Sequence, residues 1–209
     1  MKPLIQKSVV ALVLGTALIS LGGCFPLLLG GAVTGGVLVA SDRRTNGTVL
    51  EDNTIQLQSG NRLDDNIGQR AHINVNSYNR QVLLTGEVPS EQDKQLAEKV
   101  VAGVENVRNV VNELAVMGNS TLTQRSSDTL VTSRVKGNLV DARDLFANAF
   151  KVTTERGTVY LMGRVSQREA NRATEVVTIT PGVQRLVRVL EIISEDELAR
   201  MLPPADAKK

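Results

Sequence analysis

Few residues in this 209-residue chain are of types that do covalent chemistry, since it contains one cysteine and one histidine. His72 begins a predicted strand, which favours a structural or solvent-facing role, and no base is evident for a serine nucleophile. The sequence has no ligand spacing typical of a metal centre, and no glycine-rich loop carries the lysine of a nucleotide-binding motif. We therefore expect no enzymatic activity, no cofactor and no metal.

The chemistry that the sequence does predict is acylation of Cys24. Lys2 and Lys7 form a short positive region before the apolar segment 9–21, an arrangement typical of a signal peptide spanning residues 1–23. The segment ends Leu-Gly-Gly-Cys at residues 21–24, the pattern of a bacterial lipoprotein cleavage site, where small residues fit the peptidase and the cysteine thiol receives fatty acyl chains such as palmitate. The alternative is a free thiol at the end of a transmembrane anchor, for which segment 9–21 is short.

The residues after Cys24 indicate the destination. Phe25 stands where an aspartate would argue for retention in the inner membrane, so we expect an outer-membrane, lipid-anchored protein that faces the periplasm. Residues 24–46 are predicted to be a lipidated, glycine-rich tether. The alternative for residues 25–40 is a helix that self-associates through the Gly31 and Gly35 spacing.

An internal repeat organises the rest of the chain. The run VLLTGEV at residues 82–88 returns as VYLMGRV at residues 159–165, with Gly86 and Gly163 in equivalent positions. Asn106 and Gly182 also correspond, and both residue types tolerate the left-handed conformation that closes a helix. Two units of this size bury little surface, so we expect the two to pack against each other.

Each repeat is expected to have the order α-β-β-α-β. In the first, residues 51–60 are weakly helical, residues 73–84 alternate like a hairpin with its turn at 78–80, and Ser90 caps a helix that ends at Asn106, before a strand over 107–116. In the second, Ser127 or Asp128 is expected to cap the first helix.

The remaining elements of the second repeat follow the same logic. Arg156-Gly157 closes its hairpin, and Ser166 with Glu169 forms a capping box for the next helix. Pro181-Gly182 stops that helix before a last strand over 183–193, and residues 194–202 add one or two helical turns.

This order, the V.L.G.V strand and the helix-Gly-Val-strand ending resemble the BON domain. Two such units behind a lipoprotein cleavage site resemble the dual-BON outer-membrane lipoprotein family. The resemblance implies an α+β fold of two tandem domains, each with its helices packed on one face of a three-stranded mixed sheet. The implied boundaries are 47–116 for the first domain, 117–125 for a linker, 126–193 for the second domain and 194–209 for a tail. It also implies phospholipid contact through the second domain, where Leu130 stands at the position of an aromatic that the family's best-known member presents to the membrane.

Charge is distributed unevenly between the repeats. Residues 49–116 carry 6 basic and 10 acidic side chains, a net charge of −4, whereas residues 125–193 carry 11 and 7, a net charge of +4. Stacking aromatics and dense basic clusters are missing, so nucleic acid is not expected as a partner. A basic unit on a lipid-anchored chain favours contact with an anionic phospholipid membrane.

The predicted helix after residue 126 supplies candidate contact residues. Val131, Val135 and Leu139 share one face, whereas Leu130, Arg134 and Gly137 fall on a flank that suits a shallow membrane contact. The alternative is that Leu130 packs against the first repeat.

Two functions are compatible with these patterns. We favour a lipoprotein that maintains envelope integrity by binding anionic phospholipid. The alternative is a periplasmic adaptor for outer-membrane assembly or cell-wall remodelling proteins, which would dock on apolar residues of an exposed sheet face, such as Leu83, Tyr160 and Met162.

Overall fold

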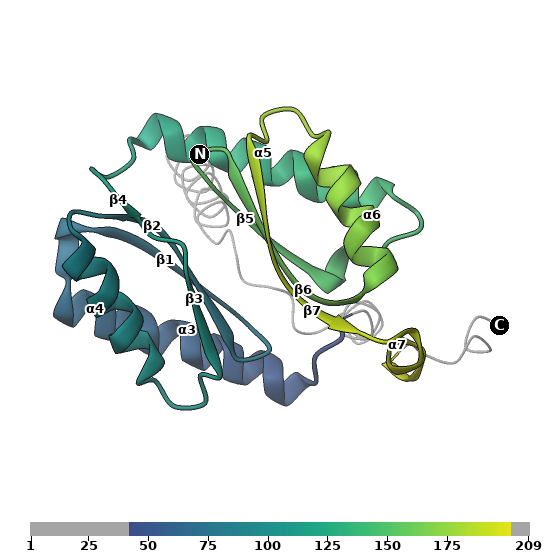
Figure 1. Ribbon diagram of the computed structural model, residues 1–209, viewed down its shortest axis with the longest axis horizontal. Coiled ribbons are helices and arrows are strands. Elements are labelled where there is room, and N and C mark those ends of the chain that lie inside the picture. The colour runs from purple at the N-terminus through teal and green to yellow at the C-terminus, as the bar shows by residue number, and fades with distance from the viewer. Residues whose placement is uncertain (1–41, 202–209) are drawn as a thin grey trace, which may run out of the picture. The chain divides into compact units, whose positions relative to one another are not determined.

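The computed structural model describes residues 42–201 (Figure 1). The first repeat contains α3 (Asn46–Asn66), η1 (Gly68–Arg70), β1 (His72–Tyr78), β2 (Gln81–Val88), α4 (Glu91–Ala102), β3 (Asn109–Asn112) and β4 (Ala115–Val116). Strand β2 pairs antiparallel with β1 and parallel with β3 and β4. Both long helices, α3 and α4, cover one face of this sheet.

The second repeat has the same architecture. It contains α5 (Leu122–Asp141), η2 (Ala147–Ala149), β5 (Phe150–Glu155), β6 (Thr158–Ser166), α6 (Gln167–Thr178) and β7 (Arg185–Ile193), and α7 (Glu195–Met201) follows. Central strand β6 pairs antiparallel with β5 and parallel with β7. Helices α5 and α6 cover one face of the sheet (Figure 1). The predicted α+β class and α-β-β-α-β order are confirmed.

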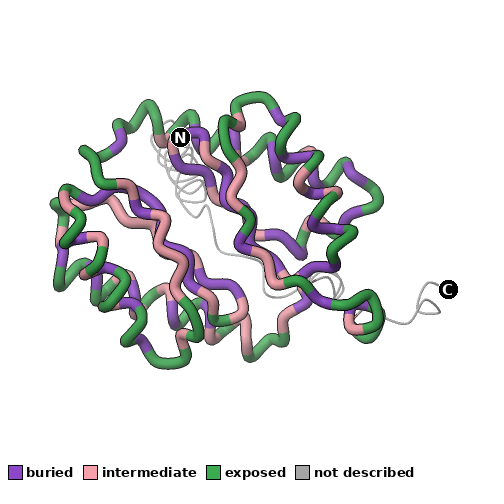
Figure 2. Tube along the Cα trace, in the orientation of Figure 1, coloured by how far each residue is buried: buried purple, intermediate pink, exposed green. Residues whose placement is uncertain are grey.

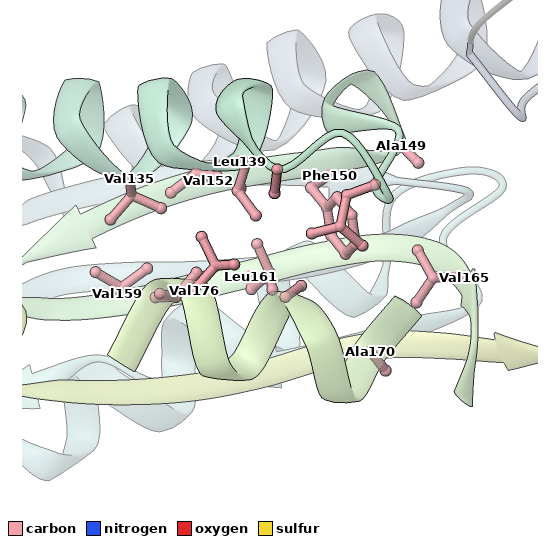
Figure 3. Close-up of a cluster of buried hydrophobic side chains, with 14 of the residues drawn as sticks. Val135, Leu139, Ala149, Phe150, Val152, Val159, Leu161, Val165, Ala170 and Val176 are labelled. Atoms are coloured by element: carbon pink, nitrogen blue, oxygen red, sulfur yellow. The ribbon is translucent and has the colours of Figure 1, made fainter. Parts of the chain in front are cut away.

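A separate apolar core lies between the helices and the sheet in each repeat. In the second repeat, Val135 and Leu139 of α5 and Val176 of α6 point toward β5 and β6 (Figure 3). In the first, Ile55 and Leu63 of α3 belong to a core that also includes Val82 and Leu84 of β2. Aliphatic side chains build the first core, and they build the second together with Phe150.

The repeated glycine of the central strand is explained by a close approach of backbone. A Cβ atom added to Gly86 would lie 2.0 Å from the carbonyl oxygen of His72, and one added to Gly163 would lie 2.5 Å from that of Ala149. Gly86 also has a φ of +114°, a conformation that side-chain-bearing residues rarely adopt. The glycine is thus required for the neighbouring edge strand to pair.

The faces of the sheets that carry no helices are buried against each other, which corrects one expectation. Leu83, Tyr160 and Met162 are 0%, 6% and 1% exposed and share an apolar cluster with Tyr78 and Val189. Figure 2 shows the buried stretches running along the strands. The two repeats therefore share an interface, as their small size predicts, and these three residues offer no docking surface.

Two helix boundaries also differ from the expectation. Helix α3 is one continuous helix from Asn46 to Asn66, longer than the predicted residues 51–60. A narrow buried stripe that includes Ile55 and Leu63 is enough to hold it against the sheet. Helix α5 begins at Leu122 with Thr121 as its N-cap and Gln124 completing a capping box. Ser127 and Asp128 thus lie inside the helix. The capping box of Ser166 and Glu169 is present as predicted.

Candidate functional site

The predicted contact flank of the second repeat lies on α5. Val131, Val135 and Leu139 are buried, so the predicted core face is confirmed. Leu130 is 59% exposed, and a Cβ atom on Gly137 would meet nothing within 4 Å. Leu130 therefore faces outward and does not pack tightly against the first repeat.

The loop after α6 extends this flank. Arg134 Nη1 lies 3.5 Å from the carbonyl oxygen of Pro181, and Asn138 donates a 2.8 Å hydrogen bond to Thr180 Oγ1. Ile179, two residues before Pro181, is 80% exposed. We call Leu130, Arg134, Gly137 and Ile179 the α5 flank. Sequence reasoning missed Ile179, although its position at the end of α6, just before Pro181 and Gly182, was a signal.

Polar contacts between the repeats surround the apolar interface. Arg43 reaches α6 with a bidentate ion pair to Glu169, with N–O distances of 2.6 and 2.8 Å, and also donates to the carbonyl oxygen of Arg164 at 2.9 Å. Both side chains of the pair are almost fully buried. Burial alone would raise the pKa of Glu169, but the hydrogen bonds from Arg43 and from the Ser166 backbone hold it below its usual value.

A second polar group, the Glu87–Glu155 cluster, comprises His72, Asn74, Glu87, Glu155 and Arg156. Glu87 accepts hydrogen bonds from Arg156 Nε at 2.8 Å and His72 Nδ1 at 3.0 Å. Although burial opposes ionisation, these bonds, with one from the Ser120 backbone, lower the pKa of Glu87. Glu155 accepts from Asn74 Nδ2 at 2.5 Å, and burial raises the pKa of its carboxyl.

Lys151 of β5 contacts the first repeat and has an unusual pKa. Its ammonium donates to Gln56 Oε1 at 2.8 Å and to the Ser77 carbonyl at 3.3 Å. Burial, reinforced by the charge of Arg44, lowers the pKa of Lys151 to about 8.

This pKa predicts a pH dependence of stability. The unfolded chain keeps this proton up to the ordinary lysine pKa of 10.5, whereas the folded chain loses it near pH 8. Between these values the unfolded state binds more protons, so this group makes the folded protein more stable as the pH rises. Urea titrations of wild type and Lys151→Met from pH 7 to 10.5 should show the free energy of unfolding of the wild type rising relative to that of the variant. A constant difference would contradict the lowered pKa.

An aspartate of each repeat's first helix holds the turn of the hairpin that follows. Asp52 accepts hydrogen bonds from the backbone amides of Asn79 and Arg80, both at 2.8 Å. Asp128 accepts from the amides of Arg156 and Gly157, also at 2.8 Å. Sequence reasoning assigned Asp128 to a helix cap and missed this role. The signal was the spacing of 76 residues, which matches the repeat.

The comparisons with known proteins agree with this architecture. The model of the BON domain family matches residues 51–118 and 127–194. The outer membrane lipoprotein DolP of Haemophilus influenzae is 37% identical over 186 residues, covering 88% of this chain and 95% of that protein. A 21 kDa hemolysin of Actinobacillus pleuropneumoniae is 31% identical, covering 73% of this chain and 79% of that protein. The osmotically-inducible protein Y of Escherichia coli is 30% identical, covering 71% and 76% respectively.

These relationships settle the family and the location. Within residues 42–201, no helix combines the length and apolar character that crossing a membrane requires. Cys24 lies outside the described residues, so its acylation stays a prediction, as does lipid contact by Leu130, Arg134 and Gly137. The extent and identity of the matches confirm the predicted resemblance. The chain belongs to the BON-domain family, as a tandem-BON lipoprotein of the outer membrane.

Proposed function

We propose that this protein helps maintain the envelope barrier by binding anionic phospholipid through the α5 flank of its second BON domain. The observation that carries the proposal is the exposure of Leu130 beside the guanidinium of Arg134. An apolar side chain enters the boundary between headgroups and acyl chains, while a neighbouring cation contacts the phosphates. Ile179 adds a second exposed apolar side chain to the same flank.

Charge supports anionic over zwitterionic lipid. The second domain has a net charge of +4 from 11 basic and 7 acidic side chains between residues 125 and 193. A basic residue near an anionic surface contributes about 1 kcal/mol at low salt, and the contribution falls within a Debye length. We therefore expect binding that is selective for anionic vesicles and weakened by salt.

Two attachment points would act together. Acyl chains on Cys24 would hold the protein at the membrane, and the α5 flank would then bind at a high effective concentration. A weak flank contact is sufficient under these conditions. The adaptor alternative depended on an exposed apolar sheet face. Leu83, Tyr160 and Met162 are instead buried between the two domains, so this support is gone.

The experiment is sedimentation of residues 42–209 with vesicles, since this fragment lacks Cys24 and contains every described residue. Leu130→Glu is expected to reduce binding to anionic vesicles by about tenfold or more. The substitution loses the insertion of an apolar side chain worth about 1.5–3 kcal/mol, and 1.4 kcal/mol corresponds to a factor of ten.

The matched control is Leu50→Glu, because Leu50 is 68% exposed on α3 of the first domain. It adds the same charge to a similarly exposed leucine away from the α5 flank, and should bind almost as wild type does. Equal losses in both variants would mean a general charge effect. Unchanged binding by Leu130→Glu would rule the flank out.

A further inference from the structure

The buried carboxylates of the Glu87–Glu155 cluster carry more negative charge than their neighbours neutralise. Arg156 ion-pairs with Glu87, whereas the hydrogen-bond partners of Glu155 are the neutral side chains of Asn74 and Thr85. Glu87 and Glu155 are 1% and 9% exposed, and within residues 42–201 the only other side chain that forms an ion-pair contact with either of them is His72. Two carboxyl groups therefore share one guanidinium in a buried site, and a cation bound between them would supply the missing counter-charge.

His72 adds a nitrogen ligand to the same cluster. Its Nδ1 lies 3.0 Å from Glu87 Oε2, and its Nε2 lies 3.4 Å from Asn74 Nδ2. The hydrogen-bond network is satisfied by a neutral imidazole that donates from Nδ1 and accepts at Nε2. Neutral imidazole is the form that ligates metal ions. One nitrogen of His72 and one oxygen from each carboxylate all lie within 4.8 Å of one another.

The position of Asn74 indicates where positive charge is preferred. Its amide nitrogen is 2.5 Å from Glu155 Oε1 and 3.4 Å from His72 Nε2, so a donor already bridges these two acceptors. Zinc bonds of about 2.0–2.2 Å place tetrahedral ligands roughly 3.5 Å apart. Side-chain rotations that move the ligand atoms by about an ångström would bring the three ligands to that separation and displace the Asn74 amide.

Two of the three ligands face a cavity. His72 and Glu155, together with Asn74, line a cavity of ≈ 540 Å³ whose wall on α5 includes Thr129, Thr132 and Ser133. A donor set of one imidazole and two carboxylates suits zinc, with water completing the tetrahedron. It is too small for calcium, which takes six to eight oxygen ligands.

We propose that His72, Glu87 and Glu155 form a zinc site that ties the two BON domains together. His72 and Glu87 belong to the first domain and Glu155 to the second. A bound ion therefore favours the arrangement in which both domains share their interface. No local ligand spacing reveals such a site, because its members come from β1, β2 and β5.

The test uses the full-length protein, purified from membranes in detergent without a histidine tag. After dialysis against zinc chloride, metal content is measured by mass spectrometry and the unfolding temperature by calorimetry. We expect one zinc ion per chain and a rise of about 5–10 °C at a zinc concentration near 100 times Kd. His72→Gln and Glu155→Gln should each lose both the zinc and the rise.

Glu155→Gln keeps the oxygen that accepts from Asn74 and removes the excess charge, so it is expected to fold. The matched control is Glu191→Gln, because Glu191 also joins the domains by accepting from Asn79 at 2.6 Å, and it should retain zinc. Asn74→Asp should bind zinc more tightly. The proposal is overturned by absence of zinc in the wild type, by unchanged zinc in the His72 and Glu155 variants, or by an equal stabilisation with calcium.

Discussion

Gly86→Ala is expected to lower the free energy of unfolding by about 3 kcal/mol or more, because two penalties combine. The added methyl group would lie 2.0 Å from the backbone oxygen of His72, so the β1–β2 pairing must open. The φ of +114° must also change, since alanine does not adopt it without strain. The equivalent Gly163→Ala should cost less, because its contact is 2.5 Å and its φ is not positive.

The measurement is the urea midpoint at constant m-value for both variants. Gly60→Ala is the control, because Gly60 lies in α3 and a methyl group there would meet nothing within 4 Å. That substitution should stabilise the protein by about 0.5–1 kcal/mol through helix propensity. A Gly86→Ala protein as stable as wild type would show that the edge strand has room to move.

Glu169→Gln is expected to cost about 3–5 kcal/mol, because it leaves the Arg43 guanidinium buried without a counter-charge. Arg43 is 8% and Glu169 1% exposed, so solvent screens the pair little. The double variant Arg43→Met with Glu169→Gln removes both charges and should recover a large part of the loss. A double-mutant cycle measures this coupling directly.

The same pair has a defined pH dependence. Because the pKa of Glu169 is lower in the folded chain than its ordinary value of 4.5, its stabilisation is fully present above that value. It disappears as the pH falls through the folded-state pKa. The difference between wild type and Glu169→Gln should therefore shrink in acid, and a difference that persists there would mean that packing, not charge, holds Arg43.

The sequence predicts most of the local structure because local rules act there. Ser90 and Ser166 accept hydrogen bonds from the third residue of their helices, as N-caps do. Asn106 and Gly182 adopt the predicted left-handed conformation, with φ values of +65° and +97°. The helices themselves end earlier than expected, α4 at Ala102 and α6 at Thr178, so both residues lie in the turns that follow. The core face of α5 followed from the spacing of its valines and leucine.

Contacts between elements that are distant in the chain could not be predicted from the sequence in the same way. The continuous apolar runs in β2 and β6 show that both faces of these strands are apolar. They do not show that a second sheet covers Leu83, Tyr160 and Met162. Asp128 has the residue type of a helix cap, and only the fold brings the amides of Arg156 and Gly157 to its carboxylate. Leu130, Arg134 and Gly137 of the α5 flank were predictable from helical spacing, whereas Ile179 belongs to it only through the fold, which places the end of α6 against α5.

The ion pair of Arg43 also orders the events of folding. Arg43 precedes the first domain, and Glu169 follows it by 126 residues, so the whole first domain is synthesised before the partner exists. A contact of such long sequence separation closes late, since loop-closure entropy opposes it until both ends are structured. Until then the second sheet does not cover Leu83 and Tyr78, and the first domain exposes an apolar sheet face that can aggregate. The chain is therefore most vulnerable to aggregation in the interval when its first domain has folded and its second has not.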